Sequence, residues 1–245
     1  MLTHEQFSQI LAPLGLPALS ETAYRRFAIY AEMLCEKNKV MNLTAIRDED
    51  EVWVRHFADS LAVYAAQKEL PARLIDVGCG AGFPGLPMKI LADDLRGDDA
   101  TKLTLLDATR KKIDFLAEVC KALGLKNVTP ISGRAEDVAA KAAHREQYDW
   151  AVSRAVADLR ILAELSLPFV RVGGKFVPHK SDRSDEEIDA ARGAIAKLGG
   201  SLVAQHVYTI SPNAPSSRVL TIAKHAASPK EFPRAYARIK ARPLA

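Results

Sequence analysis

The stretch LIDVGCGAGFPGLPMKI, residues 74–90, decides the fold of this chain. A short apolar run ends at Val77, and four glycines then arrive within eight residues: Gly78, Gly80, Gly82 and Gly85. Two prolines, at positions 84 and 87, stand where a helix can begin. A buried strand, a glycine-rich turn and a helix in this order are typical of a cradle for a nucleotide-like molecule.

The composition indicates a globular protein built around one core. The chain has 245 residues, 48% of them hydrophobic and 26% charged, and no apolar run reaches the length of a bilayer crossing. We therefore expect no membrane segment. Three cysteines without metal-type spacing argue against a disulfide framework or a zinc site, and no basic stretch precedes an apolar signal segment near the start. A cytoplasmic protein without a metal is expected.

The positive charge is concentrated at the end of the chain. The formal net charge is +4, and residues 228–245 alone carry five cations against one acid, Glu231. The cations are Lys230, Arg234, Arg238, Lys240 and Arg242. Two interpretations stay open, a solubilising tail and a contact for nucleic acid.

The periodicity divides the chain into three parts. Residues 1–68 are predicted to form a helical cap, with helices over 3–14, 20–40 and 48–67, the second capped by Ser20. Residues 69–227 alternate between strand and helix patterns and end in two strands near 201–210 and 218–225, which predicts a Rossmann-like α/β core. Its sheet is expected to be mostly parallel with a terminal antiparallel hairpin. Residues 228–245 form the basic tail.

Two cofactors compete for the glycine loop. Gly80, Gly82 and Gly85 satisfy G-x-G-x-x-G, and Asp107 follows at the end of the next predicted strand, as a nicotinamide dinucleotide requires. Against this, Asp76 places a carboxylate where a pyrophosphate would lie. The sulfonium of S-adenosylmethionine suits such a site better, and Asp107 would accept hydrogen bonds from its ribose.

Six motifs in order resemble the bacterial small-subunit ribosomal RNA guanine-N7 methyltransferase family, also called RsmG or GidB. They are NLTAIRD (42–48), RHFADSL (55–61), DVGCGAGFPGLP (76–87), TLLDATRKKIDFL (104–116), GRAED (133–137) and DWAVSRAVA (149–157). The resemblance implies a class I methyltransferase fold with a seven-stranded sheet and S-adenosylmethionine as the cofactor. It further implies methyl transfer to N7 of a guanine in the decoding-centre loop of 16S ribosomal RNA, nucleotide 527 in the standard bacterial numbering.

The family pattern also assigns residues to the cofactor and to the RNA. The expected cofactor contacts are Gly78, Gly80, Phe83, Asp107, Ala135, Glu136 and Arg154. The expected RNA contacts are Asn42, His56, Arg110, Lys111 and Lys180. Lys180 stands in a departure from the family pattern, because Ser181 follows it where the family has glycine.

No catalytic residue is assigned, because guanine N7 already has a free lone pair and needs no base. Arg154 can hold the cofactor, an RNA phosphate or only an ion-pair partner. The expected partner is 16S ribosomal RNA or the small ribosomal subunit, bound by a monomer. A nicotinamide-dependent oxidoreductase and a non-catalytic RNA-binding protein are the alternatives.

Overall fold

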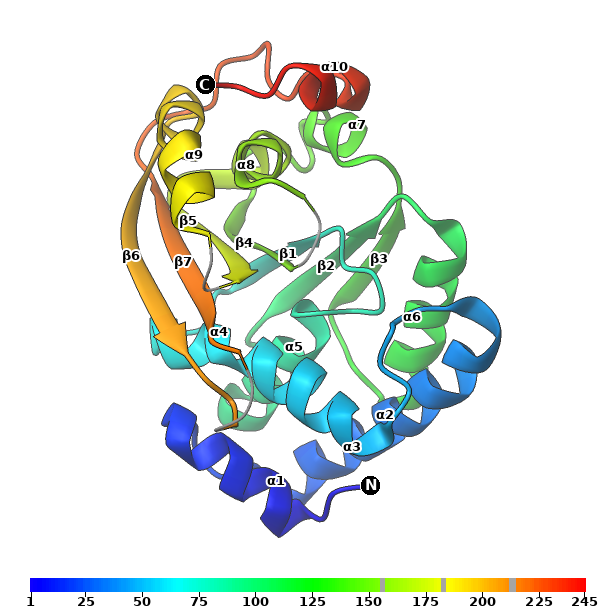
Figure 1. The fold of residues 1–245 in the computed structure, drawn as a ribbon. Coiled ribbons are helices and arrows are strands. Elements are labelled where there is room, and N and C mark those ends of the chain that lie inside the picture. The colour runs from blue at the N-terminus through cyan, green and yellow to red at the C-terminus, as the bar shows by residue number, and fades with distance from the viewer. Residues whose placement is uncertain (155–156, 182–183, 212–214) are drawn as a thin grey trace.

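The computed structural model describes residues 1–154, 157–181, 184–211 and 215–245 and contains one seven-stranded sheet (Figure 1). The order is β3 (Val128–Ser132), β2 (Lys102–Asp107), β1 (Arg73–Val77), β4 (Tyr148–Arg154), β5 (Val170–Ser181), β7 (Ser217–Lys224) and β6 (Gly200–Tyr208). Strands β3 to β5 pair in parallel, and β7 runs antiparallel to both of its neighbours. The predicted fold class is confirmed. The turn after Lys180 and part of the motif after Arg154 lie outside the described residues.

Helices cover both faces of the sheet, because its central strands are apolar on both sides. Leu74 faces one core, with α5 (Gly85–Arg96) and α6 (Arg110–Ala122). Its neighbour Ile75 faces the other, with α7 (Ala135–Ala139), α8 (Leu159–Ser166) and α9 (Asp185–Lys197). Successive residues of a strand point to opposite faces, so the run LIDV is buried on both sides.

The first 67 residues form mainly helices, which pack on the α5 and α6 side. They form α1 (His4–Leu11), the 3-10 turn η1 (Ala12–Leu14), α2 (Glu21–Met41), α3 (Glu49–Val52), the π-helical segment η2 (Trp53–Ala58) and α4 (Asp59–Gln67). Ser20 caps α2 by accepting a hydrogen bond from the backbone of Ala23. The rings of Phe27, Trp53 and Phe57 pack against one another at tilted or edge-to-face angles, in the same core as Leu74. The helical cap therefore shares one core with the sheet.

The C-terminal segment, residues 228–245, is docked onto the molecule. Arg234 pairs with Glu164 of α8, a fully buried carboxylate that accepts its backbone N–H, its Nε at 2.8 Å and its Nη2 at 2.6 Å. Phe232 and Ile239 are buried, the latter in the short helix α10 (Tyr236–Ala241). Figure 1 shows α10 beside α7 and α8, on the opposite side of the sheet from α1 and α2. The predicted tail is part of the folded structure.

Candidate functional site

The glycine loop is tied to the carboxyl end of the neighbouring strand. The backbone N–H groups of Gly78 and Cys79 both donate to the carbonyl of Leu106, at 2.8 and 3.0 Å. One residue further along β2, the Asp107 carboxylate accepts the N–H of Gly80 at 3.0 Å. These bonds hold the loop open at the crevice where ligands of parallel α/β sheets bind.

A cavity of about 360 Å³ lies at this crevice. Five of the predicted cofactor residues line it together: Gly78, Gly80, Phe83, Asp107 and Arg154. They come from the first loop, the end of β2 and the end of β4, which places them 76 residues apart along the chain at most. Lys112 also lines the cavity, with its Nζ 3.9 Å from Asp107 Oδ2.

Ala135 and Glu136, the other two predicted cofactor residues, do not line this cavity. They begin α7, and the Glu136 carboxylate accepts a hydrogen bond from the backbone N–H of Tyr236 at 3.2 Å. Gly133, just before α7, donates to the carbonyl of Asp107 at 3.0 Å. The pair therefore lies beyond the Asp107 edge of the cavity, and its contact with the cofactor stays a prediction.

Asp76 does not face the cavity, contrary to the argument from the sequence. Its side chain is fully buried under the loop, where Oδ2 accepts the backbone N–H of Gly85 at 2.8 Å. Burial raises the pKa of Asp76 to about 7. Asp107, which lines the cavity, is the carboxylate that a ligand there would meet.

Arg154 is the most heavily engaged side chain at the site. Its Nη1 donates to Asp59 Oδ2 at 2.8 Å and to the carbonyl of Arg55 at 3.2 Å. Its Nη2 donates to His56 Nδ1 at 2.9 Å, and its guanidinium lies 4.9 Å from the centre of the Phe83 ring. All of these partners except Phe83 belong to η2 and α4, so Arg154 joins the end of β4 to the helical cap.

His56 is a neutral imidazole with a defined tautomer. Because the Arg154 guanidinium can only donate, Nδ1 of His56 is the acceptor, and Nε2–H then donates to Thr44 Oγ1 at 2.7 Å. The ring stacks on Phe83 with centroids 4.5 Å apart. Burial and the nearby Arg154 charge lower the pKa of His56 to about 3, in agreement with this tautomer.

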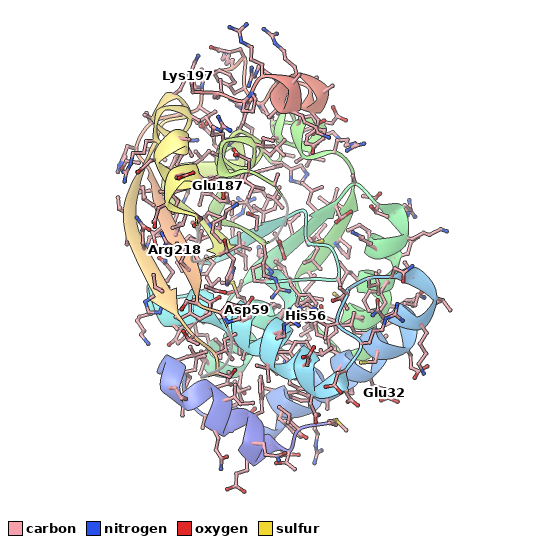
Figure 2. All side chains as sticks on the ribbon, in the orientation of Figure 1. Glu32, His56, Asp59, Glu187, Lys197 and Arg218 are labelled. Atoms are coloured by element: carbon pink, nitrogen blue, oxygen red, sulfur yellow. The ribbon has the colours of Figure 1, made fainter. Side chains whose placement is uncertain are left out.

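A second cavity, of about 450 Å³, adjoins the first, and His56 and Arg154 line both. Figure 2 shows His56 and Asp59 side by side below Glu187, near the centre of the molecule. Asp59 also lines the second cavity, and its Oδ1 accepts the Tyr208 hydroxyl at 2.7 Å. Burial opposes ionisation of Asp59, but neighbouring His179, Arg154 and Tyr208 outweigh it and lower its pKa.

Among the predicted RNA residues, His56 and Lys180 line the second cavity, whereas Asn42, Arg110 and Lys111 line neither. Asn42 ends α2 in the left-handed conformation. Arg110 and Lys111 are exposed in the first turn of α6, just after Asp107. The structure thus brings only two of the five beside Arg154.

Lys180, in β5, is held in place by the loop before α8 and by α9. Its Nζ donates to the carbonyl of Ala157 at 3.0 Å and lies 2.5 Å from Glu187 Oε1. To contact RNA, the Lys180 ammonium would have to bind a group of the RNA and Glu187 at the same time.

Sequence reasoning missed Asp59, His179 and Tyr208, which contact one another from α4, β5 and β6. His179 Nε2 donates to the Asp59 carbonyl at 3.0 Å. Asp59 lies within the quoted motif RHFADSL, and an acid on the apolar side of a predicted helix is a signal for a buried partner. Nothing local in the sequence points from Asp59 to Tyr208.

The described side chains bring together no group of three or more His, Cys, Asp or Glu able to hold a metal ion. None of the helices in the described ranges combines the length and the hydrophobicity that a bilayer crossing requires.

Comparisons with known proteins agree with this geometry. The family model described as rRNA small subunit methyltransferase G (GidB) matches residues 23–213. The chain is 40% identical over 247 residues to the ribosomal RNA small subunit methyltransferase G of Leuconostoc citreum, with all of both chains covered. It is 44% identical over 218 residues to the protein of that name from Alkaliphilus metalliredigens, with 88% of each covered.

Among solved structures, the ribosomal protein L11 methylase of Lactobacillus delbrueckii subsp. bulgaricus shares the fold with a TM-score of 0.51, at 14% identity over 70% of this chain and 79% of that one. TrmN from Thermus thermophilus gives a TM-score of 0.51 at 15% identity, over 68% of this chain and 48% of that one.

The family match, together with a seven-stranded sheet that ends in an antiparallel hairpin, identifies the chain as an S-adenosylmethionine-dependent methyltransferase. The residues present fit that cofactor, because the loop exposes a glycine backbone to the cavity and Asp107 supplies a ribose acceptor beside it. The chain belongs to the family of ribosomal RNA small subunit methyltransferase G, or GidB.

Proposed function

We propose that this enzyme transfers a methyl group from S-adenosylmethionine to N7 of a guanine in the decoding-centre loop of 16S ribosomal RNA. The observation that carries the proposal is the pair of adjoining cavities that share His56 and Arg154. The cavity at the glycine loop receives the cofactor and the second receives the acceptor base. The choice of ribosomal RNA as the substrate rests on the name of the relatives.

The shared wall favours an acceptor that brings its own lone pair. The Nδ1 lone pair of His56 accepts from Arg154, and both carboxylate oxygens of Asp59 accept hydrogen bonds. With their lowered pKa values, both groups are weak bases at neutral pH. Guanine N7 requires no proton removal, whereas an exocyclic amine or a ribose hydroxyl does.

S-adenosylmethionine, held by Gly78, Gly80 and Asp107, would supply a methyl group on a sulfonium, and guanine N7 would accept that methyl with its own lone pair. The residues of this chain contribute by holding donor and acceptor in position. Arg154, fixed between Asp59 and Phe83, sets the boundary at which donor and acceptor meet. Holding two reactants in near-attack geometry is worth about 7–11 kcal/mol in well-oriented systems.

Small subunits from cells that lack this gene, incubated with the purified enzyme and methyl-labelled S-adenosylmethionine, test the proposal. Mass mapping of the RNA should find one new 7-methylguanosine, in the decoding-centre loop. A label on another atom or in another region would reject the assignment, and no label on subunits or naked RNA would reject the function. The variant Arg154→Gln tests the boundary residue in the same assay. Arg192→Gln, on the exposed side of α9, is its matched control.

A further inference from the structure

The C-terminal segment has one side that anchors it and another that faces solvent. Phe232 and Ile239 are buried, and Arg234 is neutralised by the buried Glu164. Arg145 donates to the carbonyl of Ser228 at 2.8 Å and to that of Phe232 at 2.8 Å. The anchored side therefore fixes which residues of the segment point outward.

The outward side is basic. Its four exposed cations, the C-terminal basic face, are Lys230, Arg238, Lys240 and Arg242. Within the described ranges none of the four forms an ion pair, and Glu231 is the only acid of the segment. Figure 2 labels Lys197 near this end of the molecule, and its Nζ lies 5.5 Å from the centre of the Phe232 ring, so a further cation at the end of α9 lies beside the segment.

The face is connected to the cofactor cavity through α7. Tyr236 donates its backbone N–H to Glu136, and the Arg134 guanidinium lies 5.8 Å from the centre of the Tyr236 ring. Arg134 follows Gly133, which donates to the carbonyl of Asp107 at the cavity edge. The face and the cavity edge are thus joined by a short stretch that carries the exposed cation Arg134.

The chemistry of the face favours RNA phosphates over a lipid surface. A helix that lies on a membrane inserts an exposed apolar side between the headgroups. Here the apolar side of α10 is buried in the protein, and none of the exposed large hydrophobic residues belongs to the segment, within the part of the chain that the structure describes. A face that offers charge alone suits a phosphate backbone.

We infer that the C-terminal basic face binds backbone phosphates of the substrate RNA next to the reacting site and holds the RNA without reading its sequence. The inference rests on the proposed function, since it assigns this surface to the same substrate. Phosphate contacts orient a nucleic acid and carry no base information. The four cations should therefore strengthen binding equally for cognate and unrelated RNA.

The test compares the variant K230Q/R238Q/K240Q/R242Q with wild type, by fluorescence anisotropy against a 16S fragment with the decoding-centre loop and an unrelated RNA of equal length. Four lost phosphate contacts should make the slope of log affinity against log salt less steep by about 3. Between 50 and 200 mM salt, wild type should then lose about 60-fold more affinity than the variant. The ratio of affinities for the two RNAs should stay unchanged.

A control variant removes the same charge from exposed cations elsewhere: R25Q/K102Q/K121Q/K126Q. It should keep the slope of wild type, and both variants should keep the melting temperature because every replaced side chain is exposed. Equal slopes for the two variants would overturn the inference. So would loss of binding to phosphatidylserine vesicles with RNA binding intact, which would assign the face to lipid. Methyl transfer by wild type is measured separately, so that failure of the proposed function leaves the salt comparison readable.

Discussion

Two alanine substitutions in the glycine loop should separate the stability of the enzyme from its capacity for the cofactor. Gly82 has a φ of +105°, and a Cβ there would lie 2.5 Å from Tyr30 Oη, 2.8 Å from Leu86 Cδ1 and 2.9 Å from Leu116 Cδ2. The tyrosine cannot swing aside freely, because its hydroxyl donates to the carbonyl of Ala81. Gly80 has a φ of +58°, with no atom within 4 Å of an added Cβ.

The magnitudes follow from these environments. Overpacking costs about 1–3 kcal/mol and a left-handed non-glycine residue about 1–2 kcal/mol, so Gly82→Ala should cost about 3 kcal/mol or more. Gly80→Ala carries only the backbone cost, about 1–2 kcal/mol. In a chain of this size, 1 kcal/mol corresponds to about 2–4 °C in Tm, which separates the variants by several degrees. The methyl group at position 80 would instead occupy space beside the cavity, and a clash of about 1.4 kcal/mol weakens cofactor binding tenfold.

Differential scanning fluorimetry without ligand and calorimetric titration with S-adenosylhomocysteine measure the two effects. Gly82→Ala should have the lower Tm. For the same loss of stability, Gly80→Ala should lose more ligand affinity than Gly82→Ala. If Gly82→Ala melts within about 1 °C of wild type, the loop is not packed as closely around Gly82 as described. If Gly80→Ala binds as tightly as wild type, the cofactor does not approach this edge of the loop.

Three other predictions concern the buried charges. Because the pKa of Asp76 is raised from 3.8 to about 7, the folded state keeps a proton that the unfolded chain loses, so the contribution of Asp76 to stability should fall as pH rises through that window. In urea titrations, the free energy of unfolding of Asp76→Asn minus that of wild type should therefore grow by up to about 4 kcal/mol across the window. Glu164→Gln, which leaves Arg234 without a charged partner, should lower the free energy of unfolding by about 3–5 kcal/mol. A loss below about 1 kcal/mol would show that the Arg234–Glu164 ion pair does not anchor the C-terminal segment. Asp59→Asn should weaken S-adenosylhomocysteine binding, yet add little to Arg154→Gln in a double variant, because both break one contact; fully additive losses would show that the two act independently.

The sequence predicted the parts of the site that are local in the chain. A strand, the glycine loop and a helix follow from apolar runs, glycines and prolines within 17 residues, and Asp107 follows from the end of the next strand. Parallel topology then brings Gly78 and Asp107 together without further information. These residues line one cavity because the fold class alone requires it.

The other half of the site depends on contacts that no local pattern encodes. Arg154 and Asp59 are 95 residues apart, and Tyr208 meets Asp59 across 149 residues. The π-helical segment η2 that carries His56 lies inside a stretch whose pattern predicts one continuous helix. The charges of the C-terminal segment predict a basic tail, and they do not reveal the buried side that Phe232 and Ile239 give it.

The charge arrangement at the cavity boundary limits which acceptors this enzyme can use. A nucleophile that must lose a proton needs a neighbouring base with an unengaged lone pair, and at this boundary Asp59 and His56 are already bound to Arg154. Freeing either one would leave a partly buried guanidinium with an unsatisfied donor, a desolvation cost that a fully exposed guanidinium would not carry. The same contacts that fix Arg154 therefore make Asp59 and His56 poor proton acceptors. A ring nitrogen with its own lone pair avoids that cost, and this is the physical reason to expect N7 of guanine as the acceptor.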